Sequence, residues 1–289
     1  MTISIDYSYE RKNKEVNDSI IYARRIQEAM MLKEKHLHRL FPNSFILYKP
    51  KDIVSGDFYW FTKIEHKIII VAADSTGHGV PGAFMSVLGI NLLNQIVIEE
   101  KNTDVSFILK RLNHKLKKLF DYSNHFVEEN VEEDKRVQDG YDIAICCIDY
   151  KEFTLTFAGA MSPLFFVSNN ILFVIPGSRN SICGTKMETE RTYEKYTEKF
   201  EKGDQIYLFS DGFADQFGGL KNKKFLRKNF KSLLLDNSAL SMQEQQVVLE
   251  KTFNDWKKFE EQTDDVLVIG IQLQKSKRGC LKSCNLFKN

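Results

Sequence analysis

Four acidic residues share a sequence context that suits metal-dependent chemistry. Each lies at the end of an apolar, strand-like run and beside a glycine or a second acid: Asp57 in SGDFYW, Asp74 in ADSTGHG, Asp211 in SDG and Asp264 in TDD. A glycine at a strand end lets the backbone approach a ligand closely. Carboxylates are hard oxygen ligands, which suit magnesium or manganese better than zinc or copper.

A single Asp-Gly pair after a strand is most often a turn. Four such acids at the ends of buried strands in one domain are harder to explain as turns. Unpaired carboxylates that converge repel one another unless a cation lies between them. Two divalent ions a few Å apart can clamp a phosphate and activate a water for in-line attack. The sequence therefore predicts one divalent-metal site that hydrolyses a phosphate ester.

The composition excludes several other classes of protein. The 289 residues carry a net charge of +2, with 43% hydrophobic and 28% charged residues. This is typical of a soluble globular protein and lacks the basic stripe of a nucleic-acid binder. The polar N-terminus lacks the features of a signal peptide, and we find no apolar run of the ~20 residues that span a bilayer. Adjacent Cys146 and Cys147 in a strand-like run favour reduced thiols. We therefore expect a cytoplasmic protein without a membrane span.

The chain divides into three predicted regions, which are residues 1–40, 41–273 and 274–289. In the first, apolar residues recur at helical spacing: Val16, Ile20, Ala23, Ile26 and Met30. This helix either packs on the following domain or forms a short parallel coiled coil that makes a homodimer through residues 10–40. The last region is basic, contains Cys280 and Cys284, and is predicted to be a flexible tail.

Strand signals dominate the central region. β-Branched or aromatic runs bounded by turn residues are NSFILYK, HKIIIVAAD, YDIAICCID, FTLTFAG, LFFVS, ILFVIPG, QIYLFSDG and DVLVIGIQL. Helices are predicted over 80–100, over 104–120 with Thr103 as N-cap, and over 241–261 with a Ser241/Glu244 capping box. Several strands are apolar on both faces, so they should be buried in layered sheets. The pattern predicts an α+β layered domain.

The acid motifs, taken together, resemble a known family. They occur in the order SGDFYW, ADSTGHGVPGAFMS, SDGFADQFGG and TDDVLVIGIQL. This order resembles the SpoIIE-type branch of the metal-dependent PPM (protein phosphatase 2C-like) serine/threonine phosphatases, over about residues 41–273. The resemblance implies an α-β-β-α sandwich of two antiparallel sheets flanked by helices, preceded by an N-terminal linker helix. It also implies two divalent cations, Mn²⁺ or Mg²⁺.

The resemblance assigns a role to each acid. It implies that Asp74 bridges the two ions. The main-chain carbonyl of Ser75 would ligate one ion, and Asp57 would hold that ion's waters. Asp211 and Asp264 would complete the other ion. The family uses no protein nucleophile, because a metal-activated water attacks phosphorus. The helix after Asp74 would belong to a switch element that gates metal binding.

Two departures from the 2C-type pattern concern the residues around the ions. Those members carry a His two residues after the bridging acid, whereas His78 lies four residues after Asp74. His78 is either a general acid or a residue that begins the helix. Those members also use an upstream Arg to hold the phosphate, where this chain has Lys49 and Lys51. Lys51 is either a substitute point charge or a surface residue. Asp265 is either an additional ligand or an acid just behind the ligands.

The expected function follows from the resemblance. It implies a protein phosphatase that removes phosphate from serine or threonine on a small signalling protein in bacterial stress or sigma-factor regulation. The expected substrate is an anti-sigma-factor antagonist with a STAS fold. The alternative is a pseudophosphatase, a non-catalytic module that binds a phosphoprotein. Pseudophosphatases usually lack one or more of the acids, and all four are present here.

Overall fold

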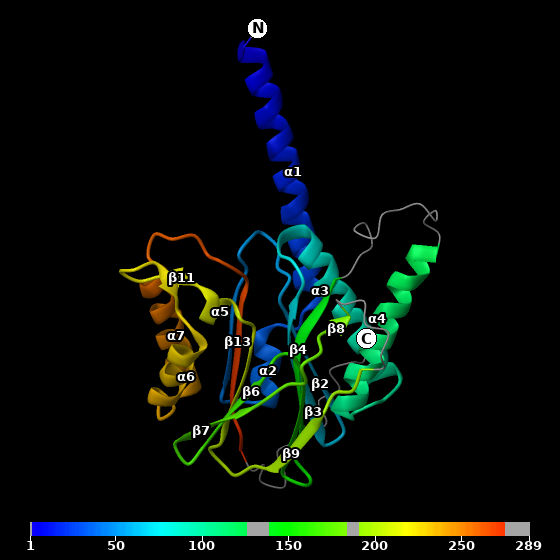
Figure 1. Cartoon of the computed structure of the whole chain (residues 1–289), viewed down its shortest axis with the longest axis vertical. Helices are drawn as coiled ribbons and strands as arrows, with labels where there is room; N and C mark the ends of the chain where they lie inside the picture. The colour runs from blue at the N-terminus through cyan, green and yellow to red at the C-terminus, as the bar shows by residue number, and fades with distance from the viewer. Residues whose placement is uncertain (1, 126–138, 184–190, 275–289) are drawn as a thin grey trace.

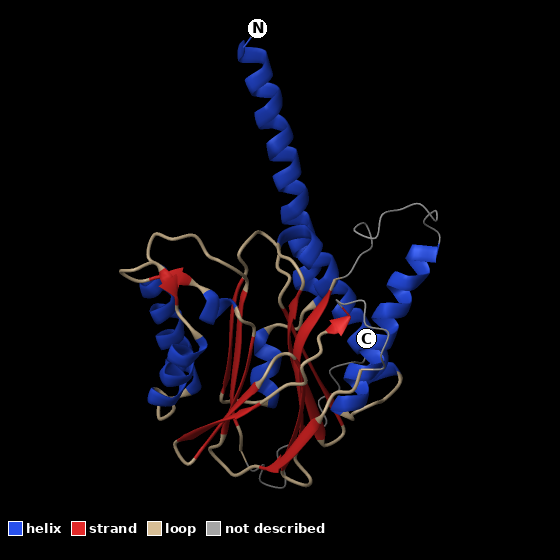
Figure 2. Cartoon of the chain, viewed as in Figure 1, coloured by secondary structure: helices blue, strands red, loops and turns tan. Residues whose placement is uncertain are grey.

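The computed structural model describes residues 2–125, 139–183 and 191–274. Two antiparallel sheets pack face to face, with helices on both outer faces (Figure 1 and Figure 2). The first sheet has the order β1 (Ser44–Lys49), β13 (Val266–Gln272), β10 (Gln205–Phe209), β6 (Leu164–Ser168) and β7 (Ile171–Ile175). The second has the order β2 (Phe58–Ile64), β3 (Lys67–Ser75), β4 (Gly140–Asp149), β5 (Thr154–Ala160) and β9 (Lys195–Lys199), with β8 (Ile182–Cys183) beside β4.

Helices cover the two sheets on opposite sides (Figure 1). Against the first sheet lie α6 (Arg227–Asp236) and α7 (Met242–Lys257). Against the second lie α3 (Gly79–Leu93), which continues into a π-helical turn η1 (Asn94–Glu99), and α4 (Val105–His125). Short elements complete the fold: α2 (Glu34–Leu40), α5 (Gly212–Asp215) and the hairpin of β11 (Phe217–Gly218) and β12 (Lys223–Lys224). The predicted α-β-β-α sandwich is confirmed.

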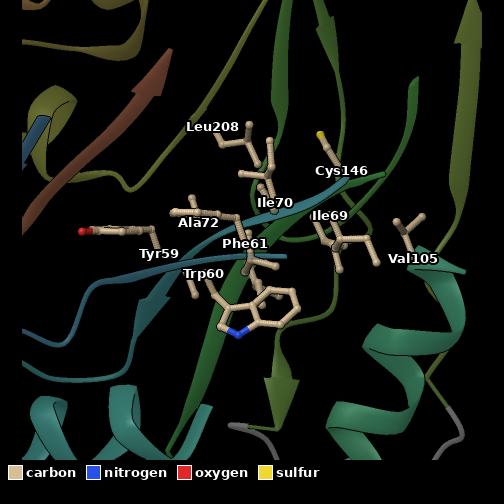
Figure 3. Packing of buried hydrophobic residues seen from close by; sticks show 14 of the residues in the cluster. Tyr59, Trp60, Phe61, Ile69, Ile70, Ala72, Val105, Cys146 and Leu208 are labelled. Carbon is tan, nitrogen blue, oxygen red and sulfur yellow. The ribbon is translucent and has the colours of Figure 1, made fainter. Parts of the chain in front are cut away.

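The strands are apolar on both faces because successive side chains point to opposite sides of the strand, and each side borders a hydrophobic core. In β13, Leu267 and Ile269 enter the core between the sheets, whereas Val266 and Val268 enter the core under α6 and α7. Both sheets contribute side chains to the core that lies between them. Figure 3 shows Ile70 of β3, Cys146 of β4 and Leu208 of β10 gathered in this cluster. The strands are therefore held on both faces, which fixes where their ends lie.

The N-terminal helix α1 (Thr2–Met30) has two different parts. Its outer part projects away from the body (Figure 1). There Val16 is 57% exposed and Tyr22 is 64% exposed. Near its end, Gln27 is buried at 3% exposure, and Leu37 in α2 is fully buried. The packed body therefore includes residues from Gln27 onward, and the predicted division of the chain at residue 40 stays a prediction.

Several element predictions need correction. Strands β2 and β9 were not predicted, because β2 begins inside the SGDFYW motif and β9 reads KYTEK, a polar edge strand. The N-cap of α4 is Asp104 rather than Thr103, since the Asp104 carboxylate accepts from the backbone N–H groups of Ser106 and Phe107. The capping box at the start of α7 is confirmed. The predicted flexible tail lies outside the described residues, except for residue 274.

One helical run tests the expectation that no segment could span a membrane. Among the described residues, Gly79–Glu99 (α3 and η1) is long and apolar enough by length and composition alone. More than half of its most apolar window, 56%, is buried inside the fold. It packs against β2, β3 and α4. Its apolar character is therefore that of a core helix.

Candidate metal centre

The four acid motifs meet at one end of the sandwich. Asp74 lies near the end of β3 in the second sheet, and Asp211 follows β10 in the first. The backbone N–H of Asp211 favours the charged form of the Asp74 carboxylate and so opposes the rise in its pKa. This interaction links the two sheets at the predicted bridging acid. Tertiary structure thus brings together motifs that lie more than a hundred residues apart in the sequence.

Asp57 is the most deeply buried of the four acids, at 2% exposure. The Ser210 side chain favours the charged form of this carboxylate and so opposes the rise in its pKa. Its Oδ2 atom has no hydrogen-bond partner among the described residues. Leaving a buried charged oxygen unpaired is costly, and native proteins usually pair such an atom or place it against a cation. This oxygen fits the predicted role of Asp57 beside an ion.

Burial, and after it mutual repulsion, raises the pKa values of Asp57, Asp74 and Asp211. Burial is the main cause that raises the pKa of Asp57 well above its usual range, and the charge of Asp74 adds to it. Burial also raises the pKa of Asp74, with further contributions from Asp211 and Asp264. The pKa of Asp211 is raised by desolvation of its carboxyl group and by the charges of Asp215 and Asp264. A divalent cation between these groups would relieve the repulsion.

Two glycines allow the loops that carry the acids to pack closely. A Cβ atom added to Gly56 would lie 2.4 Å from the carbonyl oxygen of Gly77. A Cβ atom added to Gly212 would lie 1.9 Å from the carbonyl oxygen of Asp265. No side chain fits at either position. The Asp57 loop therefore packs on the loop after Asp74, and the SDG loop packs on the TDD loop.

Asp265 holds the loop that precedes Asp57. It is buried at 3% exposure. Its Oδ1 accepts from the backbone N–H of Lys51 at 2.7 Å, and its Oδ2 accepts from that of Gly56 at 2.8 Å. Because both oxygens are engaged in this way, the geometry favours the second of its two predicted roles, an acid just behind the ligands.

The remaining predicted ligands also lie at this end. Asp264 is half-buried, and its Oδ1 accepts from the backbone N–H of Asp265 at 2.8 Å. The Ser75 hydroxyl donates to the carbonyl of Gly56 at 2.8 Å, so its side chain ties the two loops together. The ligand role was predicted for the main-chain carbonyl of Ser75, and it stays a prediction.

The donor set fits magnesium or manganese rather than a closed structural site. Among the described residues, no three His, Cys, Asp or Glu side chains are arranged to hold one ion by themselves. Magnesium usually keeps several waters and takes only one or two carboxylates from the protein. The acids here fit ions whose coordination is completed by water and main-chain oxygen. Asp57, Asp74, Asp211 and Asp264 are the residues that would hold them.

Sequence reasoning missed Asp142, which pairs with Asp74 in the register of β3 and β4. It is half-buried, and its Oδ1 accepts from the Ser181 hydroxyl at 2.6 Å. Its charge contributes to the raised pKa values of Asp74 and Asp211. Only the strand register places it here, because an acid within YDIAICCID carries no local signal of its own.

Gln27 of α1 is a second residue that sequence reasoning missed. Its side-chain amide donates to the Ser55 carbonyl at 2.6 Å and to the Ser86 hydroxyl at 2.7 Å. Its side-chain oxygen accepts from the backbone N–H of Ser55 at 3.2 Å. Ser55 lies two residues before Asp57, and Ser86 lies in α3, the predicted switch helix. One side chain thus connects the linker helix to both elements.

The predicted general acid, His78, lies at the rim of this centre and precedes α3. Its Nδ1 is 2.8 Å from Oδ2 of Asp52, and its Nε2 is 3.1 Å from Nζ of Lys51. Lys49 points to a different partner, since its Nζ donates to Glu250 at 2.7 Å. The structure thus brings His78 and Lys51 together and separates Lys49 from them.

Comparisons with known proteins agree with this geometry. Residues 64–274 match the model of the family described as Stage II sporulation protein E (SpoIIE). The phosphoserine phosphatase RsbU of Bacillus subtilis is 28% identical over 167 residues, which are 57% of this chain and 44% of RsbU. The chain therefore matches less than half the length of that relative.

Solved structures share the fold. The SiaA-PP2C domain of Pseudomonas aeruginosa superposes with a TM-score of 0.80 at 25% identity, over 91% of this chain and 99% of that domain. The PP2C phosphatase domain of SpoIIE from Bacillus subtilis, with a fragment of its regulatory domain, gives 0.59 at 18% identity, over 80% of this chain and 61% of that one. The family match covers most of the sandwich that carries the acids, and we conclude that this chain belongs to the SpoIIE family and has the fold of PP2C-type phosphatase domains.

Proposed function

We propose that this chain is a divalent-metal-dependent protein serine/threonine phosphatase. The observation that carries the proposal is the convergence of four acids on one end of the sandwich, with a buried Asp57 oxygen that has no partner among the described residues. Family membership and the phosphoserine phosphatase RsbU support the same activity. When bound, the cations would supply an activated water and would stabilise charge on the phosphoryl oxygens.

The protein's own residues prepare this site. Asp265 and the Ser75 hydroxyl fix the loop that carries Asp57. The Asp211 backbone N–H favours the charged form of the Asp74 carboxylate. These interactions hold the acids in place before any substrate arrives, and such preorganisation is a major source of catalytic rate. A small phosphoprotein with a STAS fold is the substrate we propose, by analogy with SpoIIE-type relatives.

Hydrolysis of p-nitrophenyl phosphate tests the activity. The wild-type chain should turn over this substrate with Mn²⁺ or Mg²⁺ and not after chelation. Asp74→Asn should lower the rate by at least about a hundredfold, because even residues that merely orient metal ligands are worth 10–100-fold. Equal metal-dependent rates in both proteins would contradict the assignment of Asp74. Phosphoprotein binding without turnover by the wild type would instead support the pseudophosphatase.

The outer part of α1 supports a further proposal, a parallel homodimer. Val16, Tyr22 and Ile26 are 57%, 64% and 49% exposed, which is unusual for three apolar side chains of one helix. A coiled coil would bury them. A chain that starts at Ala23 keeps Gln27 in place and should be monomeric by light scattering, whereas the full chain should have twice the monomer mass. Equal masses per chain would contradict the dimer.

A further inference from the structure

The β11–β12 hairpin and the start of α6 expose a dense group of cations. Of the eight residues 221–228, five are Lys or Arg and none is acidic, although the whole chain has a net charge of only +2. Lys224 pairs with Asp215 at 2.7 Å, whereas no ion pair joins the other four to another described residue. All five are exposed, and they are Lys221, Lys223, Lys224, Arg227 and Lys228.

Exposed apolar side chains lie among these cations. Leu220, in the turn of the hairpin, is 97% exposed, and Phe217 and Leu226 are 40% and 55% exposed. A single exposed apolar residue is ordinary on a protein surface, but a group of them often marks an interaction site. Nζ of Lys224 lies 6.0 Å from the centroid of the Phe217 ring, so charge and apolar surface are interleaved.

A buried glutamine fixes the base of the hairpin. Gln216 is fully buried. Its Nε2 donates to the carbonyls of Phe217 and Glu261, both at 2.9 Å, and its Oε1 accepts from the backbone N–H of Thr263 at 3.0 Å. Thr263 directly precedes Asp264. The base of the hairpin is therefore attached to the loop that carries one of the candidate metal ligands.

Two glycines seat the hairpin on Trp256 of α7. The backbone N–H of Gly219 donates to the Trp256 carbonyl at 2.9 Å. A Cβ atom added to Gly218 would lie 2.0 Å from that carbonyl oxygen, and one added to Gly219 would lie 2.9 Å from the indole ring. The packing is so close that no side chain fits at either position. The tip with Leu220 is thus held on a well-packed support while it stays exposed.

The other end of the hairpin is joined to the SDG loop. The backbone N–H of Leu226 donates to the carbonyl of Ala214 at 2.7 Å, and that of Asp215 donates to the carbonyl of Asp211 at 3.0 Å. The pKa of Lys224 is raised, first by its hydrogen bond to Asp215 and further by the charges of Asp215 and Asp211. Figure 1 shows β11 beside α5, which begins directly after Asp211. The cationic surface therefore adjoins the acid cluster.

We propose that the β11–β12 hairpin is a docking element for the phosphoprotein substrate, and that it binds an acidic segment whose apolar side chain covers Leu220. Cations without partners favour a protein surface of opposite charge and speed its encounter with the site. A nucleic acid fits less well, because bases stack on aromatic side chains and the tip presents a leucine. The inference rests on the proposed function for the identity of the partner as substrate, but peptide binding is measurable without turnover.

The probes are two peptides in which a phosphonate that cannot be hydrolysed replaces phosphoserine. Both carry one leucine, and they differ only in their flanking residues, which are Glu in one and Gln in the other. Fluorescence anisotropy at saturating Mg²⁺ measures their affinity for the full chain. The wild type should bind the Glu peptide roughly tenfold more tightly than the Gln peptide at low salt, and added salt should reduce this preference.

Two variants remove the two parts of the surface. Lys221→Gln combined with Lys223→Gln should reduce the preference for the Glu peptide to about threefold or less, since exposed ion pairs are each worth only a few-fold in affinity. Leu220→Ser should weaken binding of both peptides about tenfold. It should not change the affinity for a third peptide, in which serine replaces the leucine, because the two side chains then no longer interact.

Hydrolysis of p-nitrophenyl phosphate should be unchanged in both variants, because this small ester presents no segment to the hairpin. Matched controls are Lys199→Gln combined with Lys202→Gln, at the end of β9, and Ile171→Ser on β7. Both strands lie away from the hairpin (Figure 1), and their exposed side chains make these controls comparable. The controls should bind all the peptides as the wild type does.

The outcomes separate docking from other roles of the hairpin. A wild type that does not prefer the Glu peptide, or unchanged affinity for it in either variant, would overturn the proposal. Binding of an oligonucleotide or of phosphatidylglycerol vesicles that depends on the hairpin, without a preference between the peptides, would also overturn it. Hairpin-dependent binding of the Glu peptide by a chain that hydrolyses no phosphate ester would support docking and contradict the phosphatase activity instead.

Discussion

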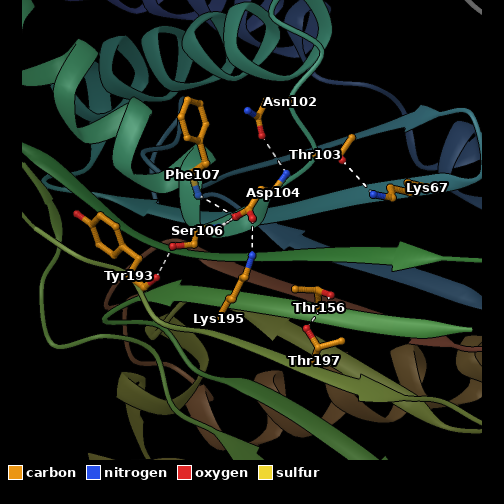
Figure 4. Close-up of polar contacts among 10 residues, drawn as sticks. All are labelled: Lys67, Asn102, Thr103, Asp104, Ser106, Phe107, Thr156, Tyr193, Lys195 and Thr197. Atoms are coloured by element: carbon orange, nitrogen blue, oxygen red, sulfur yellow. Dashed lines mark hydrogen bonds and ion pairs between the residues drawn. The ribbon is translucent and has the colours of Figure 1, made fainter. Parts of the chain in front are cut away.

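Two acids in this molecule are surrounded in opposite ways. Asp104, at the start of α4, accepts from the backbone N–H groups of Ser106 and Phe107 and pairs with Lys195 (Figure 4). Its pKa is lowered, because these hydrogen bonds and the lysine charge outweigh the cost of partial burial. Asp57 is more deeply buried, has an oxygen without a partner among the described residues, and has a raised pKa.

The difference separates an acid that holds the fold together from one that we propose holds a metal ion. The network at Asp104 is complete, since every oxygen contact is made by a donor from the chain itself. At Asp57 the neighbouring charges are also negative, so the chain supplies repulsion where a cation is needed. Buried polar atoms without partners lower the stability of an otherwise well-packed fold, and they are typical of functional sites.

Addition of divalent cations should give the largest difference between variants of Asp57 and variants of Asp104. At a hundredfold excess over the dissociation constant, Mg²⁺ or Mn²⁺ should stabilise the wild type by about 2.7 kcal/mol. This should raise the melting temperature by several degrees in a scanning calorimeter. Asp57→Asn should lose part of the shift, and Asp104→Asn should keep all of it. An equal shift in both variants would break the comparison.

The pH dependence should have opposite signs at the two acids. In the chelated protein, the raised pKa of Asp57 means that its stabilising contribution is full below about pH 4 and is lost as pH rises through the folded-state pKa. Asp57→Asn should therefore gain stability relative to wild type from about pH 4 towards neutrality. The lowered pKa of Asp104 means that its contribution is present above about pH 4 and is lost on acidification.

Denaturant unfolding in a chelator at several pH values measures both effects. The stability difference between wild type and Asp57→Asn should change with pH in one direction, and the difference between wild type and Asp104→Asn in the other. Slopes of the same sign would show that the two acids do not differ in the way that their surroundings indicate.

Gln27 is a buried polar residue that lies beside the candidate metal centre. Unlike Asp57, its side chain is hydrogen-bonded through both its nitrogen and its oxygen. Gln27→Ala should cost about 1–3 kcal/mol, because the polar groups of Ser55 and Ser86 would lose their partner. It should also weaken Mg²⁺ binding, since Ser55 belongs to the Asp57 loop. Glu28→Ala, on the exposed side of the same helix, is the matched control. A loss of stability with unchanged Mg²⁺ affinity would limit Gln27 to packing.

Asp104→Asn should have the smallest effect. Loss of a helix cap typically costs about 1 kcal/mol, and the exposed ion pair with Lys195 adds little. The measurement is the midpoint of urea unfolding, with p-nitrophenyl phosphate hydrolysis as the check that the site is intact. Lys195→Met tests the pair alone and should cost less. Reduced metal-dependent activity in either variant would contradict a purely structural network.

The sequence by itself was enough to predict the candidate metal ligands and the layered arrangement of the sheets. Asp57, Asp74, Asp211 and Asp264 stood out by chemical type and by their place at strand ends, and the order of their motifs predicted the family that the comparisons then showed. Strands that are apolar on both faces predicted buried sheets, and the alternation in β13 between two cores is the physical reason. These signals are local, so a single sequence carries them.

Only the tertiary structure decided which residues join the acids. Asp142 faces Asp74 through strand register, and Gln27 reaches Ser55 and Ser86 from a helix that the sequence could only mark as amphipathic. Contacts between segments far apart leave no periodic pattern along the chain, because strand pairing and helix packing create them. The same holds for the unpaired oxygen of Asp57. The sequence shows that a carboxylate is present, but only the fold shows that one of its oxygens has no partner among the described residues.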